Sequence, residues 1–84
     1  MKEIKIKKME RKIIYMPLLN EGTTVSRPVI ASDMGNNIYK IIGTEYGLKP
    51  EELYEEWLFP IGSYVTCKAE IRDSEDILIV NDSK

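Results

Sequence analysis

The sequence contains no histidine and only one cysteine, Cys67. A single thiol cannot form a disulfide within the chain, and the common tetrahedral zinc sites need several cysteine and histidine ligands. Histidine is also the side chain that most readily exchanges protons near neutral pH. The composition therefore predicts a protein with no metal, no other cofactor and no catalytic centre.

Long apolar runs are missing as well. Residues 1–12 alternate charged and apolar side chains and hold no apolar run of the length found in a signal peptide. No segment approaches the roughly 20 apolar residues that cross a bilayer as a helix. Together with the single cysteine, these features predict a cytoplasmic protein that has no membrane partner.

The two signs of charge are separated along the chain, whose formal net charge is −2. Residues 1–12 hold six Lys or Arg and two Glu, a net charge of +4, whereas residues 13–84 hold six Lys or Arg and twelve Asp or Glu, a net charge of −6. Lys5, Lys7, Lys8 and Lys12 are the candidate contacts to nucleic acid. Lysines on an exposed strand also prevent edge-to-edge pairing, and the acidic remainder repels phosphate, so nucleic acid is not the partner that we expect.

Short β-strands are the main pattern in this chain. Its 84 residues correspond to a single domain, 1–84, with a thin core. We expect strands over residues 3–7, 13–16, 24–31, 38–42, 64–71 and 77–80. The first two segments form one bent strand or two short ones, and Pro17 ends or bends the second. Residues 33–37, Asp-Met-Gly-Asn-Asn, predict a hairpin turn.

A short helix is expected near residues 50–56. Pro50 suits the first helical position, and Glu51 suits the positive end of the helix dipole. Leu53 and Trp57, four residues apart, would share its buried face. Five or six short antiparallel strands with one helical turn predict a small SH3-like barrel, and an OB-like barrel is the alternative.

One pattern of residues resembles a known group of proteins. The matching residues are Arg27-Pro28-Val29 with Glu21-Gly22-Thr23 before it, then Tyr39, then Trp57, Phe59, Gly62, Val65 and Cys67 in a Trp-x-Phe-x-x-Gly-x-x-Val-x-Cys spacing. Over about residues 14–71 the chain is similar to small uncharacterised bacterial proteins that share this pattern. The resemblance implies a common fold and implies no activity.

Several side chains are candidates for binding a partner: Arg27, Tyr39, Tyr54, Glu51, Glu52, Glu55 and Glu56. An arginine can hold a carboxylate through two hydrogen bonds, and tyrosines can line a peptide groove. Each has a structural alternative: Arg27 pairs with one of the glutamates, the aromatic residues form the core, and the glutamates form a solvated face. Trp57, Phe59 and Cys67 are expected in the core.

The function expected from these observations is a non-enzymatic module that binds a protein partner or its own copy. Segments 13–16 and 77–80 are apolar at both strand parities, which predicts a homodimer through an outer strand face. Leu78 or Ile79 would be the outward residue of the last strand. The alternative function is a nucleic-acid-associated barrel that uses the basic N-terminal strand.

Overall fold

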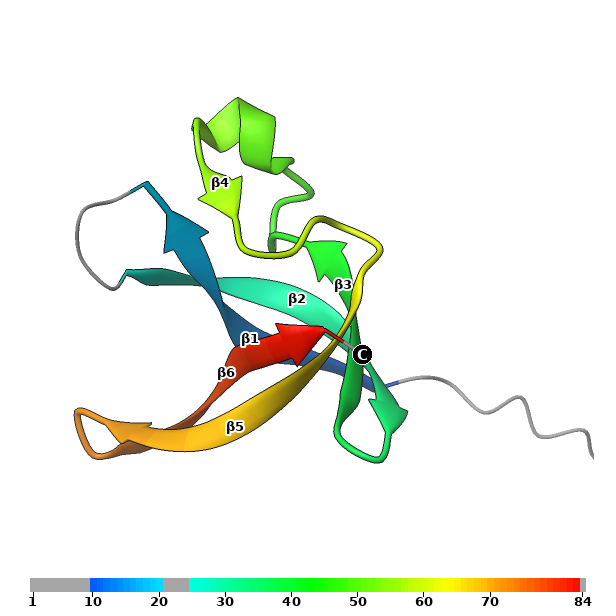
Figure 1. Ribbon diagram of the computed structural model, residues 1–84, viewed down its shortest axis with the longest axis vertical. Helices are drawn as coiled ribbons and strands as arrows, with labels where there is room; N and C mark the ends of the chain where they lie inside the picture. Colours follow the sequence, from blue (N-terminus) through cyan, green and yellow to red (C-terminus); the bar gives the residue numbers. More distant parts are fainter. Residues whose placement is uncertain (1–9, 21–24, 84) are drawn as a thin grey trace, which may run out of the picture.

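The computed structural model describes residues 10–20 and 25–83, and almost all of its regular structure is β-strand (Figure 1). The elements are β1 (Glu10–Leu19), β2 (Ser26–Gly35), β3 (Ile38–Gly43), the 3-10 helix η1 (Pro50–Leu53), β4 (Glu56–Trp57), β5 (Tyr64–Arg72) and β6 (Glu75–Ser83). The prediction of a small, mostly β barrel with five or six strands is confirmed.

Five strands close into a ring in the order β1-β2-β3-β5-β6, and each strand pairs with the next one in this order. These pairings are antiparallel, but the ring is closed by one parallel bridge between Tyr15 of β1 and Ile79 of β6. An OB-like barrel requires a Greek-key strand order, which this sequential ring does not have. The OB-like alternative is therefore wrong, and the SH3-like assignment stays a prediction.

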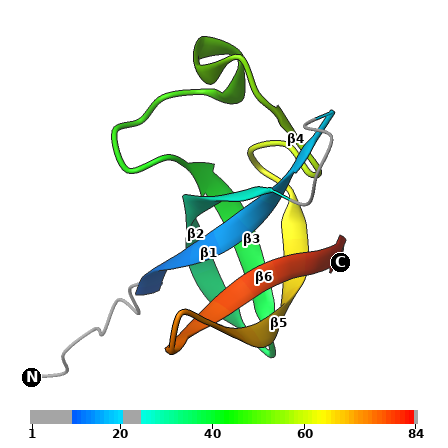
Figure 2. The same ribbon diagram turned by 90° about the vertical axis from the view of Figure 1, so that its left-hand side faces the viewer.

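The segment between β3 and β5, which includes η1 and β4, lies at one end of the barrel, and the β5–β6 turn lies at the other (Figures 1 and 2). β4 pairs with the end of β1 outside the ring, and Trp57 lies opposite Leu18. This pairing directs the indole toward the barrel interior.

Alternation along the strands builds the core, because successive side chains of a strand point to opposite faces. The buried cluster comprises Ile14, Met16, Val29, Ala31, Tyr39, Ile41, Trp57, Val65, Cys67 and Val80. Phe59 is half-buried and packs against this cluster. The predicted core positions of Trp57 and Cys67 are confirmed, and Phe59 lies at the margin of the core.

The hairpin predicted at residues 33–37 connects β2 to β3. Asn36 and Asn37 both adopt positive φ angles, 56° and 61°, which are typical of tight two-residue hairpin turns. The carboxylate of Asp33 accepts a hydrogen bond from the Gly35 amide at 2.9 Å. The prediction of this hairpin is confirmed.

Of the two alternatives for Pro17, that it ends or that it bends the strand, the first is wrong. β1 continues to Leu19 with Pro17 opposite Ser26 of β2. Proline has no amide hydrogen to donate. The Pro17 carbonyl, however, accepts a hydrogen bond from the Leu58 amide at 3.0 Å, so the strand can continue through this position. The strand expected over residues 3–7 lies outside the described residues.

The helix expected near residues 50–56 is a single 3-10 turn over Pro50–Leu53. Tyr54 adopts a left-handed conformation, with φ 56° and ψ 42°, and thereby ends the turn. Trp57 then enters β4, so the expected helical face shared by Leu53 and Trp57 does not form. The tertiary pairing of β4 with β1 prevails over the local helical pattern.

The apolar segment 77–80 is covered in the single chain. Ile79 is only 7% exposed and Leu78 packs against the core. A register shift beside Cys67 brings Val80 opposite that inward residue. The expectation that Leu78 or Ile79 offers an exposed surface to a dimer is therefore wrong, whereas Ile13 on the outer face of β1 is 50% exposed.

Candidate functional site

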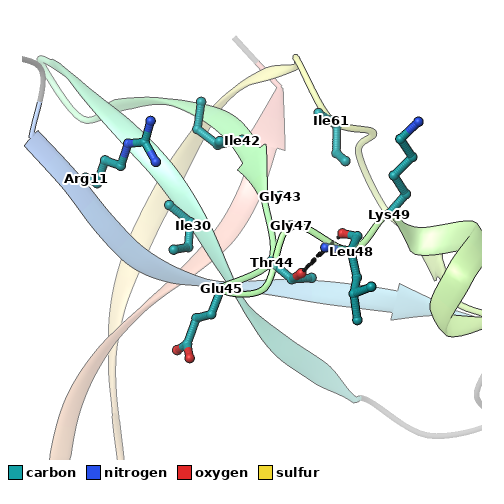
Figure 3. A pocket seen from close by; sticks show the side chains of 10 residues that line it. All are labelled: Arg11, Ile30, Ile42, Gly43, Thr44, Glu45, Gly47, Leu48, Lys49 and Ile61. Atoms are coloured by element: carbon teal, nitrogen blue, oxygen red, sulfur yellow. Dashed lines mark hydrogen bonds between the residues drawn. The ribbon is translucent and has the colours of Figure 1, made fainter.

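A groove of about 370 Å³ lies on the outside of the barrel (Figure 3). This volume is at the lower end of the range of small-molecule pockets, roughly 300–1,000 Å³. Ile30 of β2 and Ile42 of β3 form its floor, and Arg11 of β1 lies at one side. The loop that follows β3 and the side chain of Ile61 complete the wall.

The floor is apolar because β2 and β3 each carry an isoleucine on the outer face, next to an apolar core residue on the inner face. Ile41 is fully buried in the core, so the next residue, Ile42, points outward and is only partly covered. Ile30 likewise follows the buried Val29. Both isoleucines therefore remain available to a ligand.

Hydrogen bonds hold the loop Thr44–Lys49 in its path beside the groove. The buried Thr44 hydroxyl accepts the Leu48 amide at 2.8 Å and donates to the Leu48 carbonyl at 3.2 Å (Figure 3). The Gly47 amide donates to the Thr44 carbonyl at 3.1 Å, and Gly47 has φ +74°, which glycine adopts without strain. Leu48 and Lys49 are thereby fixed on the rim.

The opposite wall is fixed to β3 by the backbone. The Gly62 amide donates to the Ile41 carbonyl at 2.8 Å, and the Ile41 amide donates to the Ser63 carbonyl at 2.9 Å. Ile61, which is 40% exposed, is thus held next to Gly43, where its Cδ1 approaches the glycine. Hydrogen bonds therefore fix both walls, and the groove is preformed.

Two cations and one carboxylate surround the apolar floor. Arg11 and Lys49 lie on either side of Ile42 and Ile61, and Glu45 extends from the other edge (Figure 3). Neither cation forms an ion pair with another of the residues that the structure describes. The groove therefore has a net charge of +1, whereas the other described residues together have a net negative charge.

The structure brings together two of the predicted partner-binding residues, Arg27 and Glu55. The Arg27 Nε lies 2.7 Å from Glu55 Oε1, although its N–H is not aligned for a hydrogen bond. The same carboxylate oxygen accepts the Trp57 indole N–H at 3.1 Å. Arg27 thus forms an internal ion pair, which was the structural alternative to partner binding.

We expect the Arg27–Glu55 contact to be coupled energetically. Arg27→Met and Glu55→Gln should each lower the free energy of unfolding by about 1–3 kcal/mol, because each leaves a partly buried charge without its counter-ion. The double variant should lose less than the sum, with a coupling of about 0.5 kcal/mol or more in urea denaturation. Glu56→Gln, on the exposed neighbour, is the control; strictly additive losses would contradict the ion pair.

The remaining predicted partner-binding residues are dispersed. Tyr39 is only 6% exposed and belongs to the core, so its assignment to a binding surface is wrong. Burial, followed by the nearby Asp33 carboxylate, raises the pKa of Tyr39. Tyr54 is 95% exposed, Glu51, Glu52 and Glu56 are exposed as well, and none of these four residues lines the groove.

Of the four lysines predicted to contact nucleic acid, the structure describes Lys12, which forms an ion pair with Asp33. The Nζ–Oδ2 distance is 3.2 Å, and the hydrogen bond to Asp33 raises the pKa of Lys12. The Gly35 amide and then Lys12 lower the pKa of Asp33. Lys5, Lys7 and Lys8 lie outside the described residues.

Residues 10–20 and 25–83 contain neither a metal-binding cluster nor a membrane-spanning helix. Within these ranges no three His, Cys, Asp or Glu side chains are grouped as a metal site. The described helical structure, the short turn η1, is neither long nor apolar enough to cross a membrane.

No family model, curated protein or solved structure matches the chain. The resemblance to the bacterial group therefore stays a prediction. The groove was not predicted from the sequence. Its residues come from three strands, β1, β2 and β3, and from two loops, so no local pattern connects them. The available signal was that Ile30 and Ile42 each stand next to a core residue in the same strand.

Proposed function

We propose that this protein is a non-enzymatic protein-binding module whose groove receives an apolar side chain of its partner. The observation that carries the proposal is a preformed groove of about 370 Å³ with an isoleucine floor and two cations without an ion-pair partner among the described residues. An exposed apolar depression with a polar rim is typical of interaction sites on small domains.

The chemistry of the groove favours binding over catalysis. Its hydroxyl group, on Thr44, is buried and bonded to both backbone groups of Leu48. The single thiol, Cys67, lies in the core, where burial raises its pKa to about 11. A nucleophile needs a base or positive surroundings that lower its pKa, and neither group has them.

The charge of the described residues disfavours nucleic acid as a partner. They contain seven Lys or Arg and twelve Asp or Glu, so their net charge is −5. Affinity for nucleic acid depends largely on cations that neutralise phosphates and release counterions. The described surface, with Lys12 engaged by Asp33, is poorly suited to that role.

Selection of peptides from a displayed random library on the purified full chain tests the proposal. We expect enriched peptides to share a large apolar residue and to shift the backbone amide resonances of residues 42–48. Ile42→Glu should weaken their binding at least tenfold, because the charge would occupy the apolar floor.

Tyr54→Ser serves as the matched control, because Tyr54 is exposed and does not line the groove. Its peptide affinity should equal that of the wild type. Selected peptides that bind Ile42→Glu as tightly as the wild type, or that shift resonances elsewhere, would place the binding site away from the groove.

A further inference from the structure

The turn between β5 and β6 carries an exposed apolar side chain at the far end of the molecule. Ile71 is 74% exposed, and Ala69, which has the same strand parity, is also exposed. Asp73 and Ser74 form the two-residue turn and both have positive φ angles, 49° and 66°. Tight turns of this kind fix the two strands, so Ile71 is presented on a preorganised protrusion.

Acidic side chains surround this protrusion. Asp76 lies directly opposite Ile71, and Glu75 lies opposite Arg72. Residues 70–76 contain four carboxylates and one arginine, a net charge of −3. Glu70 pairs with Arg72 at 3.0 Å, whereas Asp73, Glu75 and Asp76 form no ion pair with other described residues.

The hairpin and the groove are complementary in both polarity and charge. The groove has an apolar floor of Ile30 and Ile42 between two cations, Arg11 and Lys49. The hairpin has one projecting isoleucine, Ile71, among four carboxylates, of which only Glu70 forms an ion pair with a described residue. Opposite potentials on two such surfaces favour their encounter and fix their relative orientation.

One chain cannot satisfy this complementarity by itself. Both views place the β5–β6 turn at the lower end of the barrel and the loop after β3 above it, and no residue of the hairpin lines the groove (Figures 1 and 2). Building on the proposed binding function, we propose that the occupant of the groove is the β5–β6 hairpin of a second copy, with Ile71 as the inserted side chain.

This contact joins two different surfaces of the protein. In a two-fold dimer each copy would insert its hairpin into the groove of the other; otherwise successive copies would form a ring or an open chain. Stable interfaces bury about 1,200 Å² or more, and a contact of one hairpin with one groove is expected to be smaller. We therefore expect self-association with a Kd in the micromolar range or weaker, which weakens further as salt screens the carboxylates from Arg11 and Lys49.

Sedimentation equilibrium of the full chain from about 10 μM to 1 mM tests the proposal. The wild type should associate, and Ile42→Glu in the groove or Ile71→Glu in the hairpin should each weaken association at least tenfold. An equimolar mixture of these two variants should recover a heterodimer, because each variant retains one intact surface. Tyr54→Ser, which changes neither surface, should associate like the wild type.

Circular dichroism establishes that each variant is folded. If Ile42→Glu unfolds, Arg11→Glu replaces it as the groove variant, and Asp76→Arg should restore its association by reversing both charges. A wild type that stays at 9.7 kDa throughout, or a mixture that stays monomeric, would overturn the self-assembly. Because the monomer would still bind selected peptides in its groove, that result is distinguishable from failure of the proposed binding function.

Discussion

Trp57→Ala is expected to lower the free energy of unfolding by about 3–5 kcal/mol, because it leaves a large cavity in a thin core. Trp57 is 7% exposed, packs in the central cluster and donates its indole N–H to Glu55. It also occupies the pairing of β4 with β1, opposite Leu18. At roughly 0.05–0.15 kcal/mol per residue, 84 residues give a total stability of about 4–13 kcal/mol, so the loss removes much of it.

Urea denaturation followed by far-ultraviolet circular dichroism measures this effect without relying on the tryptophan itself. Trp57→Phe retains an aromatic ring and loses the hydrogen bond to Glu55, so it should lose clearly less stability than the alanine variant. Tyr54→Ala, at a side chain that is 95% exposed, should stay within about 0.5 kcal/mol of the wild type. Unchanged stability in Trp57→Ala would mean that the indole is not a core element.

Cys67 in the native protein is expected to react with a thiol reagent at pH 8 at least about a hundredfold more slowly than in the unfolded chain. Burial raises the pKa of the thiol from 9.0 to about 11, so the reactive thiolate is about a hundredfold less populated in the folded state. The side chain is also only 6% exposed, which restricts the approach of the reagent. Alkylation with and without urea, followed by mass spectrometry, measures the ratio.

The same pKa shift predicts a loss of stability at alkaline pH. The folded-state pKa lies above that of the unfolded thiol, so the contribution of Cys67 is fully present below pH 9 and is lost as pH rises toward 11. The wild type should lose stability more steeply than Cys67→Ala over this range, and equal slopes would contradict the shift. Rapid alkylation of the folded wild type would show that Cys67 is accessible.

The strands and the β2–β3 hairpin could be predicted from local pattern. Alternation identified the residues that face inward, such as Val65 and Cys67, because a strand's period of two depends only on sequence spacing. The Asn36–Asn37 turn was also predictable, since few residue types adopt positive φ easily. The helix near residues 50–56 was overestimated, because Trp57 is more stable when paired in β4 and buried than on a helical face.

The candidate site was the least predictable feature. Arg27 and Glu55 are 28 positions apart, and of the several glutamates in the chain only the fold selects the one that pairs with the arginine. The groove draws Arg11, Ile42 and Ile61 from distant segments, and no local pattern connects them. Ile79 was equally unpredictable in the opposite sense. Its position in the strand places it on the outer face, but it is buried because β6 pairs with β1 at Tyr15.

The sequence by itself determined the class of fold, the inward face of most strands, and the burial of Trp57 and Cys67. These follow from side-chain periodicity and turn chemistry, which act over a few residues. Only the tertiary structure decided which outward apolar residues are covered, as Ile79 is, and which line a groove, as Ile42 does. The physical reason is that exposure depends on which strand or loop lies beside a residue, and that depends on how the barrel closes.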